Sequence, residues 1–98
     1  MSAGEVLQIR IDEVRQKIAA AVENSGRTPQ SVKLVAVSKT HPAALVREAI
    51  DLGLTDFGEN RVQEAEDKII EVGRSAARWH LIGHLQTNEA RRAVKLFD

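Results

Sequence analysis

Short apolar segments recur along this chain at a nearly constant interval, and that interval constrains the fold more than any single motif. The segments begin near Val32, Thr55 and Trp79, so successive starts lie 23 and 24 residues apart. An amphipathic stretch with helical period follows each of them. Strand–helix units of this length predict right-handed crossovers and a parallel sheet. We therefore expect an α/β fold of parallel βα units, compatible with a (β/α)8 barrel.

A long amphipathic segment precedes the first unit. Its apolar residues recur at steps of three and four, which predicts a leading helix with one inner stripe. Ser25-Gly26 marks its end, because glycine readily adopts the left-handed conformation that closes helices. The stripe consists of Leu7, Ile11, Val14, Ile18 and Val22.

Each unit divides into a strand and a helix. We expect strands at residues 32–38, 55–58 and 79–83, the first of them buried because its apolar run is continuous. The helix after the second strand should place Lys68 toward water, and its inner stripe should be Val62, Ala65, Ile69 and Val72. The last helix should begin near Thr87, with Ala90, Val94 and Phe97 inward.

The length of 98 residues corresponds to one small domain. A complete barrel usually has about 250 residues. We therefore interpret residues 1–98 as the N-terminal part of a barrel, truncated to about three strands with a leading helix. Three strands leave two unpaired edges and an incompletely filled inner face, which favours self-association through the exposed sheet edges.

Composition argues against several classes of protein. The formal net charge is zero, so no long-range field attracts nucleic acid or an anionic membrane. There is no cysteine, and residues 1–5 lack the basic and apolar parts of a secretion signal. No apolar run approaches the roughly 20 residues that span a bilayer. We expect a soluble, cytoplasmic protein that binds neither nucleic acid nor membranes.

Polar residues follow each predicted strand, in the segments 38–41, 58–61 and 83–88. The carboxyl ends of parallel strands meet at one rim, where α/β folds gather their chemistry. Lys39 lies at the end of the first strand, and lysine amines form Schiff bases with carbonyl compounds. On position alone, the favoured interpretation of Lys39 is a solvated loop residue, and that of Asn60 is the N-cap of a helix.

Other residues have simpler interpretations. His80 alternates with apolar neighbours and should be a hydrogen-bonded core histidine, while Trp79 should be a packing residue. His41 and His84 lack Cys, Asp or Glu at metal-ligand spacing, so we expect no metal site. No nucleophile elbow, Walker loop or dinucleotide-binding glycine motif occurs.

Three blocks of sequence together resemble one family. V-A-V-S-K-T at 35–40, F-G-E-N-R-V-Q-E at 57–64 and W-H-L-I-G-H-L-Q-T-N at 79–88 occur in the order and at the spacing of the pyridoxal phosphate homeostasis proteins. The barrel of that family is similar to the N-terminal domain of alanine racemase. The resemblance covers nearly the whole chain, although Glu89 stands where the family usually has lysine.

The resemblance implies a cofactor site for pyridoxal 5′-phosphate (PLP). By position, Lys39 is the lysine that forms the internal aldimine, and Asn60 lies beside the cofactor. The third block brings Ile82 and His84 near the cofactor rim, without a definite role. The family holds the phosphate through later strand–helix loops, so we expect these 98 residues alone to bind PLP weakly.

Three functions follow from this interpretation. The first is a PLP carrier or regulator that holds the cofactor as a lysine Schiff base and has no robust catalytic activity or catalytic residues of its own. The second is a PLP-dependent racemase or decarboxylase, which the absence of tyrosine and of a second domain disfavours. The third is a truncated half-barrel that acts only through self-association.

Overall fold

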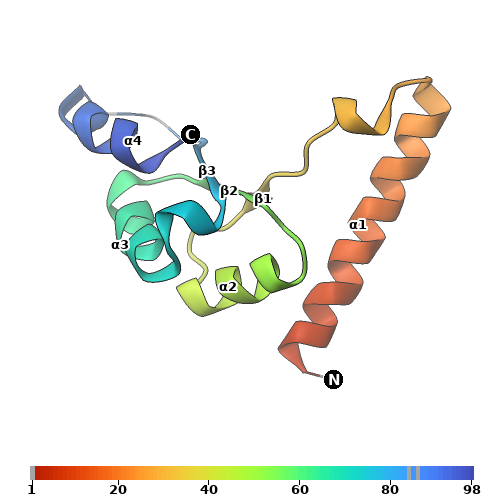
Figure 1. Cartoon of the computed structure of the whole chain (residues 1–98), viewed down its shortest axis with the longest axis horizontal. Coiled ribbons are helices and arrows are strands. Elements are labelled where there is room, and N and C mark those ends of the chain that lie inside the picture. The colour runs from red at the N-terminus through yellow and green to blue at the C-terminus, as the bar shows by residue number, and fades with distance from the viewer. Residues whose placement is uncertain (1, 84, 86) are drawn as a thin grey trace. The chain divides into compact units, whose positions relative to one another are not determined.

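A computed structural model describes residues 2–83, 85 and 87–98 of the chain. The chain divides into two compact units, Met1–Leu34 and Val35–Asp98. Figure 1 shows the long helix of the first unit and the small sheet with its helices in the second. No helix in these described ranges combines the length and the apolar character that crossing a membrane requires.

The first unit consists mainly of helix α1 (Ala3–Ser25), whose presence the sequence predicts correctly. The predicted inner stripe is wrong at Val14, which is exposed. The Ser2 hydroxyl accepts a hydrogen bond from the Glu5 N–H at 3.1 Å and caps the first turn. Gly26 ends the helix with φ 73°, and the Arg27 N–H reaches back to the Val22 carbonyl at 3.1 Å. A 3-10 turn (Pro29–Ser31) follows.

The second unit contains a three-stranded sheet with the order β1-β2-β3. The strands are β1 (Ala36–Val37), β2 (Asp56–Glu59) and β3 (Arg78–Leu81). Both pairings are parallel, with Ala36 opposite Phe57 and Phe57 opposite Trp79. The prediction of an α/β fold with parallel strands is therefore confirmed.

Helices connect the strands, as parallel pairing requires. These are α2 (Ala43–Asp51) and α3 (Val62–Val72), which pack against each other. A 3-10 turn (Arg74–Ala76) leads into β3, and another (Thr87–Glu89) precedes α4 (Ala90–Leu96).

Alternation along the strands gives the sheet two different faces. Phe57 and Trp79 lie on one face, are buried, and have ring centroids 5.7 Å apart. Their neighbours in the core include Val62, Ala65 and Ile69 of α3. The opposite face carries Val37 and Ile82, which remain 51% and 48% exposed.

Three sequence predictions about this unit are wrong. The first strand is only two residues long, and Val37 is half exposed because it lies on the face of the sheet opposite Phe57 and Trp79. Lys68 is buried rather than facing water. Val94 is 81% exposed whereas Ala93 is buried. Ala90, also predicted inward, is exposed, so α4 buries the face that carries Ala93 and not the face that carries Ala90 and Val94.

Candidate functional site

The candidate site lies at the carboxyl ends of the three strands. Lys39 comes two residues after β1 and is exposed. It occupies a tight turn in which the His41 N–H donates to the Ser38 carbonyl at 3.1 Å. Thr40, the third residue of that turn, has φ 66°. A β-branched residue rarely adopts this left-handed conformation, which costs about 1–3 kcal/mol, so other contacts must hold the turn.

Ser38 anchors the turn on its N-terminal side. Its N–H donates to the Gly58 carbonyl of β2 at 2.9 Å. Its hydroxyl donates to the carboxylate of Glu59, and the side chain is buried. The backbone immediately before Lys39 is therefore bonded to the end of the central strand.

A buried ion pair completes this anchor. The Lys68 amine lies 3.0 and 3.1 Å from the two carboxylate oxygens of Glu59, and the exposed fractions of the two side chains are 5% and 0%. The same amine donates to the Ser38 carbonyl at 2.6 Å. Lys68 thus joins helix α3 to the ends of both β1 and β2.

Glu64, one helical turn before Lys68, anchors the other side of the turn. Its carboxylate accepts the Thr40 N–H and lies 3.4 Å from the Lys68 amine. The Thr40 hydrogen bond, with a smaller effect from Lys68, lowers the pKa of Glu64 below its ordinary value. Glu64 is therefore held as a carboxylate beside the turn.

Sequence reasoning missed this cluster. Glu59 lies within the F-G-E-N block, but the sequence predicts no role for it. Lys68 is predicted to face water on its helix. A usable signal was present, because Lys68 falls four residues after Glu64 and three after Ala65 on the stripe that faces the sheet. A charge at such a position needs a buried partner.

Asn60 and Gly83 meet at the ends of β2 and β3. A Cβ atom added to Gly83 would overlap the Asn60 side-chain oxygen and lie 2.5 Å from the Asn60 carbonyl oxygen. The N-cap of α3 is Arg61, so the interpretation of Asn60 as an N-cap is wrong. Asn60 is instead exposed at the rim of the sheet, next to β3.

The third strand end brings Ile82 over the centre of the sheet. Two of its side-chain carbons lie 3.2 Å from the point that a Cβ of Gly58 would occupy. The Ile82 N–H donates to the backbone carbonyl of Glu59 at 2.9 Å. His84, the remaining predicted site residue, lies outside the described residues. The strand ends therefore bring Asn60 and Ile82 to one rim, with Lys39 two residues beyond the first strand.

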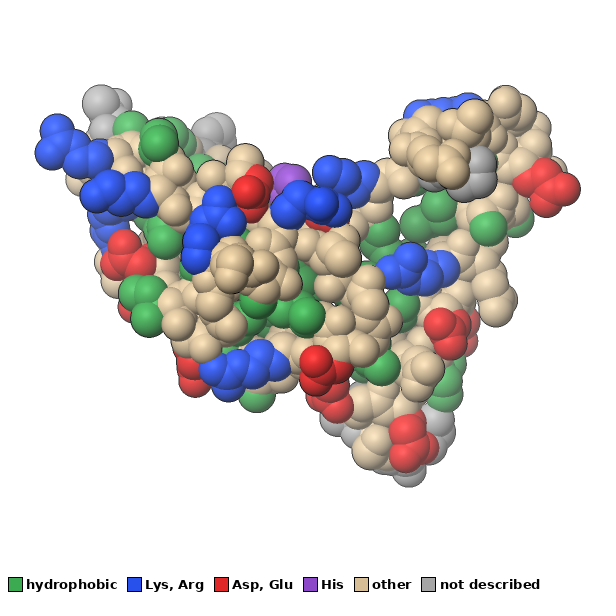
Figure 2. All heavy atoms as spheres, viewed as in Figure 1, with side chains coloured by type: hydrophobic (Ala, Val, Ile, Leu, Met, Phe, Trp, Pro, Cys, Tyr) green, Lys and Arg blue, Asp and Glu red, His purple; other side chains and the backbone are tan. Residues whose placement is uncertain are grey.

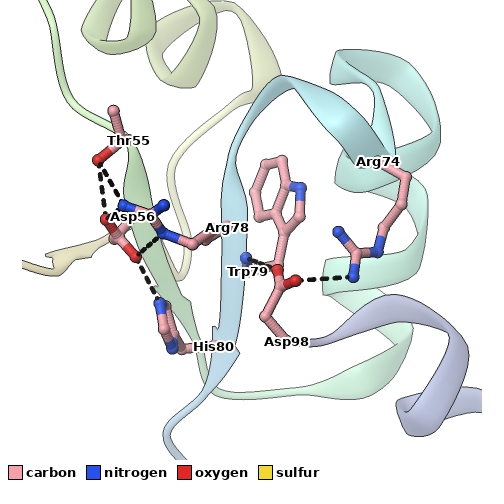
Figure 3. Close-up of polar contacts among 7 residues, drawn as sticks. All are labelled: Thr55, Asp56, Arg74, Arg78, Trp79, His80 and Asp98. Atoms are coloured by element: carbon pink, nitrogen blue, oxygen red, sulfur yellow. Dashed lines mark hydrogen bonds and ion pairs between the residues drawn. The ribbon is translucent and has the colours of Figure 1, made fainter.

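A second polar cluster occupies the opposite end of the sheet (Figure 3). The buried carboxylate of Asp56 accepts hydrogen bonds from Arg78 at 2.9 and 3.0 Å and lies 2.8 Å from the His80 ring. The Arg78 hydrogen bonds, opposed by burial, hold the pKa of Asp56 far below its ordinary value. His80 is thus hydrogen-bonded as predicted, but its side chain is partly exposed and does not belong to the core. Trp79 is a buried packing residue as predicted.

Charge is evenly distributed over the visible surface. In Figure 2, Lys and Arg side chains alternate with Asp and Glu side chains over the second unit. Within the described residues, no group of three His, Asp or Glu side chains is arranged to hold a metal ion.

Comparison with known proteins agrees with the three sequence blocks. The pyridoxal phosphate homeostasis protein of Escherichia coli K12 is 49% identical over 89 residues. The chain is homologous to the N-terminal part of the pyridoxal phosphate homeostasis proteins. The match covers 88% of this chain but 38% of the E. coli protein, so the chain spans less than half the length of that relative. No family model matches the sequence.

Solved structures of similar proteins share the fold. PipY of Synechococcus elongatus, crystallised with PLP bound, is 48% identical with a TM-score of 0.68, over 86% of this chain and 39% of PipY. An unknown protein from Bifidobacterium adolescentis is 32% identical with a TM-score of 0.87, over all of this chain and 45% of its own.

Proposed function

We propose that this chain is a PLP-binding part of a PLP homeostasis protein, in which Lys39 holds the cofactor as a Schiff base. The lysine amine would condense with the cofactor aldehyde, forming a C=N bond and releasing water. The homology to proteins named for PLP homeostasis, and the PLP-bound structure of PipY, support this proposal. The proposed role is that of a carrier or regulator without robust turnover of its own.

The observation that carries the proposal is the placement of Lys39. Its exposed side chain belongs to a turn at the carboxyl end of β1. Ser38, before Lys39, is bonded to β2 and α3, and Thr40, after it, is bonded to α3. Asn60 and Ile82 stand at the neighbouring strand ends, where they would flank a planar ligand. An amine can condense with an aldehyde, and an amide and an apolar side chain can contact the ring that bears it. We propose His84 as a further neighbour of the cofactor.

We also propose that residues 1–98 form the first part of a (β/α)8 barrel. The N–H groups of Arg78 and Ile82 donate to the backbone carbonyls of Thr55 and Glu59. Because the direction of the backbone N–H and C=O groups alternates along a strand, those of Trp79 point away from β2. The Asp98 N–H donates to the Trp79 carbonyl at 2.7 Å, where a fourth parallel strand would pair. In such a barrel the phosphate sits near late strands. The 98 residues alone should therefore bind PLP weakly.

We propose a cytoplasmic protein whose small-molecule partner is PLP, with no nucleic acid or membrane partner. A second candidate function is self-association of a half-barrel through its exposed sheet edges, and the half-exposed Val37 and Ile82 favour such association.

Titration with PLP tests the cofactor proposal. We expect a saturable absorption change and, after borohydride reduction, a PLP adduct at residue 39. Lys39→Ala should abolish both signals, whereas Lys95→Ala on the exposed face of α4 should change neither. A wild-type protein without an adduct at Lys39 would overturn the proposal, and tight binding would overturn only the expectation of weak affinity.

A further inference from the structure

The turn that carries Lys39 is held in an unfavourable conformation by groups outside it. Thr40 has φ 66°, a conformation that glycine or asparagine adopts more readily than threonine. Ser38, immediately before Lys39, and Thr40, immediately after it, both make hydrogen bonds to side chains of α3. Residue 39 itself lies between these two anchors.

The two anchors belong to one connected network. The Lys68 amine bonds the Ser38 carbonyl at 2.6 Å, and Glu64 accepts the Thr40 N–H. Lys68 and Glu64 are also paired with each other at 3.4 Å. Glu59 supplies the opposite charge that keeps the Lys68 amine at this buried position.

We propose that Lys68 and Glu64 are positioning residues for Lys39, an inference that rests on the proposed Schiff base. They hold the backbone on both sides of residue 39, so that its amine is presented to an aldehyde from a fixed turn. Neither side chain needs to touch the cofactor, because each acts through the backbone of the turn. Loss of the Glu64 contact leaves Thr40 free to return to an ordinary conformation, and loss of the Lys68 contact releases the Ser38 carbonyl; either change should displace Lys39.

The test compares adduct formation at Lys39 with adduct formation at other lysines of the same molecule. Each protein is incubated with PLP and reduced with borohydride, and the modified peptides are quantified by mass spectrometry. The exposed Lys17 and Lys95 serve as internal references, because a general loss of stability does not lower one site selectively.

Glu64→Ala and Lys68→Met should each lower labelling of Lys39 relative to Lys17 and Lys95, by about tenfold for the loss of one charge-assisted hydrogen bond. Lys68→Arg keeps the charge and should recover part of the labelling. Amide hydrogen exchange without PLP should show faster exchange at Thr40 in Glu64→Ala, which reports the anchor independently of the cofactor.

Two matched control variants test whether the loss of labelling is specific to contacts with the turn that carries Lys39. Asp67→Ala removes an exposed carboxylate from the same turn of α3. Arg92→Met removes a different ion pair of α3, in which Arg92 lies 2.8 Å from Glu66. Both controls should leave the ratio of Lys39 to reference labelling unchanged.

The outcomes separate the two proposals. Absence of any adduct at Lys39 in the wild-type protein contradicts the proposed function. A wild-type adduct with the same labelling ratio in Glu64→Ala contradicts the positioning role alone. Because the Glu64 side chain is 34% exposed, we expect Glu64→Ala to fold even where Lys68→Met does not, so the comparison of labelling ratios still decides.

Discussion

Asn60 and Gly83 lie so close together that no methyl group fits between them. The contact involves both the side chain and the backbone carbonyl of Asn60, so a rotation of the side chain alone cannot relieve it. The ends of β2 and β3 therefore depend on a glycine at residue 83 to keep Asn60 at the rim.

Gly83→Ala tests this dependence. The added methyl must push the ends of the two strands apart, which should lower the free energy of unfolding by about 1–3 kcal/mol. If Asn60 contacts PLP, the same change should weaken PLP binding. Urea denaturation and a PLP titration measure the two effects.

Asn60→Ala is the companion variant. It leaves Gly83 in place and removes only the amide, so it should weaken PLP binding with little loss of stability. Unchanged stability and unchanged PLP affinity in Gly83→Ala would show that the strand ends are free to move apart.

The pair of Lys68 and Glu59 provides a second prediction. Lys68→Met leaves the fully buried Glu59 carboxylate without its counter-charge, which should cost about 3–5 kcal/mol of stability. The double variant Lys68→Met/Glu59→Gln removes both charges and should be more stable than Lys68→Met alone. Urea denaturation of the single and double variants measures the coupling between the two residues.

The more exposed pair of Arg92 and Glu66 is the control for this cycle. Arg92→Met should cost less than about 1 kcal/mol, because solvent screens both partners. Equal losses in Lys68→Met and Arg92→Met would show that burial adds nothing to the first pair.

The fold could be predicted from the sequence because its signals are local and periodic. The regular interval between Val32, Thr55 and Trp79 predicts three parallel strand–helix units. Gly26 indicates the end of α1 because glycine readily adopts the left-handed conformation that ends a helix. Strand length was not predictable in the same way. The extent of β1 depends on which strands pair with it, and an apolar run such as 32–38 does not contain that information.

The candidate site was only partly predictable for a similar reason. Lys39 and Asn60 are recognisable because each follows a predicted strand. Ile82 lies within the predicted strand 79–83 and was recognisable only from the block that resembles the family. The buried contacts of Lys68 with Glu59 and Ser38 join residues that are 9 and 30 positions apart in sequence. Such contacts arise from the packing of α3 on the sheet, so they become visible only in three dimensions.

Acid should destabilise the second unit through Asp56. Hydrogen bonds from Arg78 hold the pKa of Asp56 below the ordinary value of about 3.9. A lowered folded pKa gives stability that is present above the unfolded pKa and is lost as pH falls through the folded one. We therefore expect the free energy of unfolding to decrease progressively below about pH 5.

Two variants check the contribution of this carboxylate. Asp56→Asn and Arg78→Met should each reduce the difference in urea midpoint between pH 7 and pH 3. Arg47→Met removes an exposed arginine that donates a hydrogen bond to the Glu71 backbone carbonyl, and it should leave that difference unchanged. The same pH dependence in Asp56→Asn as in the wild type would assign the effect to other carboxylates.

The face of the sheet that carries Val37 and Ile82 leads to the last prediction, which concerns the association of copies of the chain. Val37 lies on this face and Val94 on the outer side of α4, and both valines are largely exposed. If copies of the chain associate through the sheet, a charge at residue 37 must be desolvated in the complex, whereas a charge at residue 94 stays in water. Val37→Lys should therefore weaken self-association by about tenfold or more, and Val94→Lys should not change it. Sedimentation at several protein concentrations measures the association. A wild-type chain that stays monomeric at every concentration, or equal weakening by both lysines, would place no interface on this face.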